Sequence, residues 1–145
     1  MKKLHLFSFF HLNLMFSSIE ENQRTEVIKK CYWPILNLAS EHKIPIGVEA
    51  TGITLELINA IDKNWINELK NLIKKGLCEF IGSGYSQIIG PIVPYEINLN
   101  NQIIGKKIYK ELLNVDPKIA LINEQAFSSN LISLYKVAGY ETIIM

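Results

Sequence analysis

The chain has 145 residues, of which 48% are hydrophobic and 20% are charged, a balance that is ordinary for a folded globular domain. Its 15 Lys and Arg residues and 14 Asp and Glu residues give a net charge of +1, and no basic cluster is dense enough to indicate binding to nucleic acid or to an anionic membrane. The two cysteines, Cys31 and Cys78, are too few for a disulfide framework. We therefore expect a cytoplasmic protein with two reduced, mostly buried thiols.

The first predicted element is a strand within the apolar run that extends to residue 16. Lys2 and Lys3 precede this run, which gives it the outline of a secretory signal. However, His5, His11 and Asn13 interrupt the run, and no small-residue cleavage site follows it. It is also too short to span a membrane. A fully buried first strand is therefore the favoured interpretation.

An amphipathic helix is predicted after a polar, loop-like stretch at residues 17–24, because apolar residues recur at helical spacing. These residues are Val27, Cys31, Ile35 and Leu38. Pro34 lies inside the helix and lacks a backbone N–H, so it should bend the helix or split it at Trp33.

The second predicted strand covers residues 44–48 and ends at Glu49. Thr54 is a candidate cap for a short helix after it, and Asp62 or Asn64 for the next helix. The apolar faces of these two helices are Leu55, Ile58 and Ile61, and Trp65, Leu69, Leu72 and Ile73. The third predicted strand covers residues 77–81.

A glycine-rich loop at residues 82–87 follows the third strand, and Asn98 or Asn100 then begins a long helix. The predicted core face of that helix is Ile104, Ile108 and Leu112, with Ile103 beside them. The fourth strand is predicted over residues 118–122, and Ser128 or Ser129 caps the helix after it. The predicted core face of this last helix is Leu131, Leu134, Tyr135 and Ala138.

A fifth strand is predicted over residues 141–145, so strands and helices alternate along the whole chain. Every connection between strands is long enough for a parallel crossover. The sequence therefore predicts an α/β fold with a parallel (β/α) barrel arrangement. Because an exposed apolar strand edge is a liability, we also expect residues 1–145 to be the N-terminal part of a larger barrel with about five of its strands.

Polar residues stand where the predicted strands end. His11 and Asn13 close the first strand, Glu49 the second, and Asn123 and Glu124 the fourth. In a parallel sheet these ends share one edge, which is where α/β folds build their active sites. Two carboxylates among hydroxyl-binding side chains suit glycoside hydrolysis, which commonly uses one as nucleophile and another as acid.

Each of these residues also has a structural explanation. Glu124 could cap a helix or solvate a strand end, and a lone histidine such as His11 is often only a hydrogen-bonded structural residue. Asn13 is a poor ligand for transition metals, and we predict no metal or other cofactor. Glu49 is the hardest to explain structurally, because a carboxylate at the end of an apolar strand needs partners or a function.

Four segments together resemble glycoside hydrolase family 57, in the order and spacing of the N-terminal half of its catalytic domain. They are residues 11–13, 47–49, 79–87 and 120–125. The resemblance implies an incomplete (β/α)7 barrel and retaining enzymes that act on α-glucans without a metal. It departs from the usual pattern at the first motif, normally His-Gln-Pro, and before the nucleophile, normally Trp-Leu-Pro. These departures suggest an uncharacterised branch.

The resemblance also implies roles for individual residues. Glu124 matches the catalytic nucleophile, His11 the histidine of the first motif, and Glu49 the glutamate of the second. Tyr85 falls in the loop that shapes the substrate site, and we expect Asn13 and Asn123 to contact substrate as well. The general acid of the family is an aspartate on a later strand, beyond Met145.

We therefore expect the chain to be part of a retaining α-glycoside hydrolase or α-glucan transferase. Its expected partners are an oligosaccharide or polysaccharide substrate and the remainder of its own barrel. One alternative is a polysaccharide deacetylase-like hydrolase, which would need a metal site of His and Asp that the polar strand ends do not supply. Another is a catalytically inactive carbohydrate-binding barrel.

Overall fold

The computed structural model describes residues 6–145 and contains five strands and six α-helices. Lys2, Lys3 and His5, which entered the interpretation of the first residues, lie outside this range. The strands are β1 (Phe9–Leu12), β2 (Ile46–Ala50), β3 (Cys78–Ile81), β4 (Ile119–Leu121) and β5 (Thr142–Ile144). Within the described residues, no helix is both long and apolar enough to cross a membrane.

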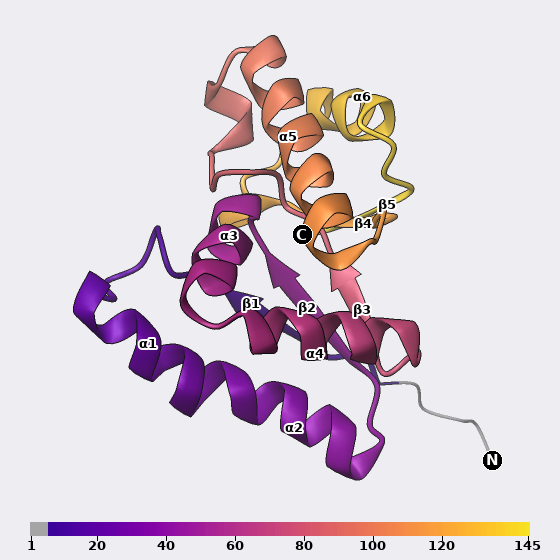
Figure 1. Ribbon diagram of the computed structural model, residues 1–145. Helices are drawn as coiled ribbons and strands as arrows, with labels where there is room; N and C mark the ends of the chain where they lie inside the picture. Colours follow the sequence, from indigo (N-terminus) through magenta and orange to yellow (C-terminus); the bar gives the residue numbers. More distant parts are fainter. Residues whose placement is uncertain (1–5) are drawn as a thin grey trace, which may run out of the picture.

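All strand pairings are parallel, which confirms the predicted arrangement. Strands β1, β2 and β3 form one sheet in that order, and β4 pairs with β5. The two sheets meet at a single bridge between Gly82 and Ala120. There the N–H of Gly82 donates to the carbonyl of Ile119 at 2.9 Å, and the N–H of Leu121 donates to the carbonyl of Gly82 at 2.8 Å. Figure 1 shows β2 and β3 running side by side toward the end of the molecule where α5 and α6 lie.

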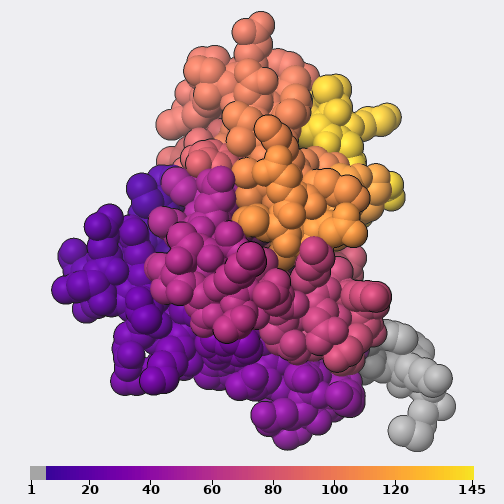
Figure 2. Space-filling view, viewed as in Figure 1, coloured from indigo at the N-terminus to yellow at the C-terminus, as the bar shows by residue number. Residues whose placement is uncertain are grey.

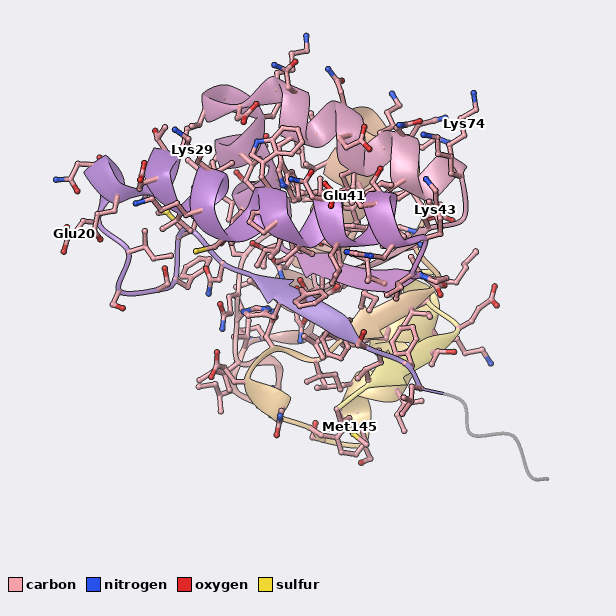
Figure 3. The ribbon with its side chains drawn as sticks, turned by 90° about the horizontal axis from the view of Figure 1, so that it is seen from below. Glu20, Lys29, Glu41, Lys43, Lys74 and Met145 are labelled. Carbon is pink, nitrogen blue, oxygen red and sulfur yellow. The ribbon has the colours of Figure 1, made fainter. Side chains whose placement is uncertain are left out.

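Helices connect successive strands. They are α1 (Arg24–Val27), α2 (Trp33–His42), α3 (Gly52–Ile61), α4 (Lys63–Lys74), α5 (Tyr95–Leu113) and α6 (Asn130–Val137), with short turns η1 (Glu21–Gln23), η2 (Ile28–Tyr32), η3 (Gly90–Ile92) and η4 (Asn123–Gln125). Seen from below, α2 and α4 lie on one side of the strands, while Met145 after β5 lies on the opposite side (Figure 3). Helices α2 and α4 therefore cover one face of the first sheet.

Two apolar clusters correspond to the two sheets. The larger one packs β1–β3 against α2, α3 and α4 and has Trp65 and Leu69 fully buried at its centre. The smaller one packs β4 against α6, and it contains all four residues of the predicted α6 face. That prediction is confirmed, as is the face of α4, where Trp65, Leu69 and Leu72 are buried.

The first helix buries a different face from the predicted one. The buried residues are Ile28, Tyr32, Leu36 and Ala39, which repeat at the predicted spacing but one position later. Both sets are apolar and lie side by side on the helix surface, so periodicity alone does not separate them. Cys31 is consequently exposed, contrary to prediction, whereas Cys78 is buried, and burial raises the pKa of its thiol to about 12.

The helix is not split at Trp33: Tyr32 and Trp33, just before Pro34, keep helical backbone angles, and the change at this point is a local π-helical turn. Residues 28–32 form a π-helical turn in which the N–H of Trp33 donates to the carbonyl of Ile28, and α2 begins at Trp33 with Pro34 in its first turn. Pro34 has no N–H to donate to the preceding turn, and the π-helical turn accommodates it without ending the helix.

Several predicted helix starts are wrong by a few residues. Thr51, not Thr54, caps α3, and its hydroxyl accepts the N–H of Thr54. Asp62 caps α4 as one of the two predicted candidates. Helix α5 begins at Tyr95, ahead of the predicted asparagines. Strand β1 is also less buried than predicted, because Phe9 and Phe10 are only half-buried.

The predicted core face of α5 is wrong over the first part of the helix. Ile103 and Ile104 are about half exposed, at 51% and 45%. The buried side consists instead of Asn98, Asn101, Gln102 and Gly105. This side faces the loop after β3, whose backbone polar groups need hydrogen-bond partners rather than apolar cover.

Candidate active site

His11 and Glu49 form a partly buried pair at the carboxyl end of the first sheet. They stand opposite each other in the register of β1 and β2, and Nδ1 of His11 donates to Oε2 of Glu49. The side chain of Glu49 is fully buried, whereas that of His11 is 41% exposed. The hydrogen bond to Glu49 raises the pKa of His11 above its ordinary value, and the nearby charge of Glu124 adds to this effect. The pair therefore presents a readily protonated imidazole at the surface.

Glu124 stands just beyond β4, at the same edge of the strands. Its backbone has a φ of 56° and that of Gln125 has a φ of 53°, so two consecutive non-glycine residues adopt the left-handed conformation. This conformation is costly for such residues. Its effect is to turn the chain sharply after the strand and leave the Glu124 side chain exposed.

Gln87 joins the polar residues at the ends of β1 and β4. Its Nε2 donates to Oε1 of Glu124, and its Oε1 accepts from Nδ2 of Asn13 at 2.6 Å. The side chain of Asn13 also accepts the N–H of Phe16 at 2.8 Å, which closes a tight turn after β1. A neutral carboxamide thus orients the Glu124 carboxylate from one side.

The other two predicted substrate-binding residues contact the protein itself. The hydroxyl of Tyr85 donates to Glu56 on α3 at 3.0 Å, and this bond raises the pKa of Tyr85. The side chain of Asn123 is buried and donates to the carbonyl of Ser83 at 3.1 Å. The structure thus brings His11, Asn13, Glu49 and Glu124 together. Substrate binding by Tyr85 and Asn123 stays a prediction.

The loop after β3 that carries Gln87 is held rigidly by α5. The hydroxyl of Tyr109 accepts the N–H of Ser83 at 3.1 Å and donates to the carbonyl of Gly84 at 2.7 Å. A Cβ on Gly105 would lie 2.4 Å from the backbone carbon of Gly84. Only glycine at position 105 allows the helix to approach the loop so closely, which fixes Gln87 relative to the strands.

Gln87 was not among the predicted site residues, although it lies within one of the segments that carry the family resemblance. The sequence indicates only weakly that Gln87 belongs to the site. It lies two residues after Tyr85, and a polar residue in a glycine-rich loop is usually solvated. Among residues 6–145, no three His, Cys, Asp or Glu side chains are grouped so that they could hold a metal ion.

These elements define a class of protein: a parallel α/β fold of the (β/α) barrel type with carboxylates at the carboxyl edge of its strands. The solved structure of 4-alpha-glucanotransferase from Thermococcus litoralis shares the fold with a TM-score of 0.84 at 22% identity, over 94% of this chain and 21% of that one. The alpha-amylase AmyC from Thermotoga maritima gives a TM-score of 0.77 at 14% identity, over 94% of this chain and 38% of that one.

Sequence comparison supplies the family. The model of glycosyl hydrolase family 57 matches residues 3–145, and the chain belongs to that family. An alpha-amylase of Pyrococcus furiosus is 23% identical over 121 residues, which make up 83% of this chain and 18% of the relative. The chain thus spans about a fifth of the length of such relatives.

Proposed function

We propose that Glu124 is the nucleophile of a retaining α-glycoside hydrolase or α-glucan transferase that this chain forms together with further parts of its barrel. The observation that carries the proposal is the position of its exposed carboxylate at the carboxyl edge of the strands, contacted by Gln87 and near the His11–Glu49 pair. The names of the relatives, alpha-amylase and 4-alpha-glucanotransferase, suggest α-glucan as the substrate class.

In the proposed first step, a carboxylate oxygen of Glu124 forms a bond to the anomeric carbon while the bond from that carbon to the glycosidic oxygen breaks. A general acid, proposed as an aspartate elsewhere in the barrel, gives its proton to the leaving oxygen. Water or an acceptor hydroxyl then attacks the same carbon, releases Glu124 and returns a proton to that aspartate. His11 and Asn13 are proposed to contact the sugar hydroxyls.

Glu49 does not suit the role of general acid. Its side chain is fully buried and one of its oxygens accepts from His11, so it has no route to a leaving oxygen at the surface. Its proposed role is to keep His11 protonated and oriented. We accordingly expect the 145-residue chain alone to have little or no hydrolytic activity.

The proposal is tested by labelling the protein that contains this chain and the remaining barrel with a fluorinated α-glucosyl fluoride. We expect mass spectrometry to find the glycosyl ester on Glu124. We also expect Glu124→Ala to lower kcat by about 10³-fold or more, with partial rescue by azide, while Glu111→Gln on the surface of α5 leaves kcat unchanged. A label on another residue, or robust turnover by the 145-residue chain, would show that the assignment is wrong.

A further inference from the structure

A hollow separate from the residues of the candidate active site lies between the start of α5 and helix α6. Its volume is about 350 Å³, and it is lined by residues from the segment 90–98 and from the segment 128–134. These two segments lie side by side at one end of the molecule, the salmon and yellow parts at the top of Figures 1 and 2. Loops from β3 and β4 lead directly from the active site into the two walls.

The lining of this hollow suits a neutral, hydroxyl-rich ring. Tyr95, which is 48% exposed, offers an aromatic surface at one wall, and the buried Leu131 adds an apolar floor. Ser128, Asn130 and Ser133 contribute polar side chains from the opposite wall. Of the described residues that line the hollow, none is charged. Small-molecule sites in proteins combine apolar and aromatic walls with a few placed polar groups in this way.

Asn98, which lines this hollow, carries a buried polar atom without a partner. Its side chain is 1% exposed, and its Nδ2 donates to the carbonyl of Gly90 at 3.3 Å. Its Oδ1 is buried and has no hydrogen-bond partner within residues 6–145. A buried acceptor without a partner is unfavourable, and a donor from a bound molecule would satisfy it.

The walls of the hollow are already ordered. A Cβ on Gly90 would lie 3.0 Å from Nδ2 of Asn98, so the loop and helix are in close contact there. The side chain of Asn101 both accepts the N–H of Ser86 at 2.7 Å and donates to its carbonyl at 3.0 Å. A site held in this way loses little conformational freedom on binding, which favours even a small ligand.

We propose that this hollow is an additional sugar-binding subsite, which holds one glucose ring of the α-glucan whose scissile bond lies at Glu124. The ring would stack on Tyr95 and donate a hydroxyl hydrogen to Oδ1 of Asn98. Ser128 is four positions after Glu124, so the backbone distance between them is at most about 14 Å, which a short oligosaccharide spans. The choice of α-glucan rests on the proposed function, whereas the shape and polarity of the hollow do not.

The test is an NMR titration of the 15N-labelled 145-residue chain with maltotriose, which needs no enzymatic activity. We expect the amide signals of Tyr95, Asn98 and Ser133 to shift with a common dissociation constant in the millimolar range. Tyr95→Ala should weaken this binding about fivefold and Asn98→Leu about tenfold. Ile97→Ala is the matched control, because Ile97 is exposed on the same turn of α5 but does not line the hollow.

The outcomes separate this inference from the proposed function. Shifts confined to the residues around His11 and Glu124 would overturn the subsite and leave the proposed function intact. Shifts at the hollow that the two variants abolish would support the subsite, even if a label never forms on Glu124. Equal shifts with glycerol at the same concentration, or equal binding by the wild type and Tyr95→Ala, would also overturn it. Tyr95 is at the surface, so its variant remains informative if Asn98→Leu does not fold.

Discussion

Replacing His11 with alanine should destabilise the fold by about 3 kcal/mol at neutral pH. Glu49 is fully buried, and within residues 6–145 its carboxylate has His11 as its hydrogen-bond partner at Oε2 and none at Oε1. Removing one member of a buried pair costs about 3–5 kcal/mol, because the other charge stays buried without compensation. We take the lower end because His11 is 41% exposed, so that water partly screens the pair.

Urea denaturation of the 145-residue chain, followed by circular dichroism, measures this cost. The double variant His11→Ala/Glu49→Gln should recover about 1–2 kcal/mol of it, because a buried neutral amide costs less than a buried charge. His42→Ala is the control, since His42 is exposed, and it should change the free energy of unfolding by about 0.5 kcal/mol or less. A cost for His11→Ala below about 1 kcal/mol, or no recovery in the double variant, would refute the reasoning.

The same pair sets a pH dependence with a defined sign. Because the pKa of His11 is raised in the folded state from its ordinary value of 6.5, the protonated imidazole stabilises the fold fully below that ordinary value. This contribution is lost as the pH rises through the raised pKa. The difference in stability between the wild type and His11→Ala should therefore shrink as the pH rises from about 6.5 through the raised pKa of His11, which urea denaturation at a series of pH values measures.

Three further substitutions test the parts that position the site. Tyr109→Phe should lower the free energy of unfolding by about 2 kcal/mol in urea denaturation, because the N–H of Ser83 and the carbonyl of Gly84 lose a buried partner; no change would mean that water replaces the hydroxyl. Gly105→Ala should lower the free energy of unfolding by about 2–3 kcal/mol, because the new Cβ would meet the backbone of Gly84. The melting temperature should fall accordingly, and an unchanged melting temperature would contradict the close approach. Gln125→Gly should instead raise the free energy of unfolding by about 0.5 kcal/mol, because glycine adopts the left-handed backbone conformation without strain. A decrease in the free energy of unfolding would show that Gln125 is not strained.

The sequence predicts the order of strands and helices because buried parallel strands appear as short apolar runs between helical patterns. Residues 118–122 are such a run, and β4 lies within it. Glu49 and Glu124 were placed at one edge by the same reasoning, since parallel strands share the direction in which they end. That part of the site follows from topology alone, without knowledge of any side-chain contact.

What the sequence does not predict depends on contacts between distant segments. The buried polar face of α5 exists because Asn98 and Asn101 bind the backbone of a loop that periodicity analysis cannot see. The choice between two adjacent apolar stripes on the first helix is likewise made by packing. Gln87 enters the site only because the fold brings Asn13 and Glu124 within its reach.

The candidate site is divided between the two apolar clusters, whose sheets meet at the bridge between Gly82 and Ala120. His11 and Glu49 belong to the sheet that the larger apolar cluster covers, and Glu124 follows the sheet that the smaller cluster covers. A local opening along this seam would separate the carboxylate from the imidazole while each cluster stayed packed. The arrangement of the candidate site would then be lost before global unfolding, and the temperature range in which the site is intact would be narrower than the range in which the chain is folded.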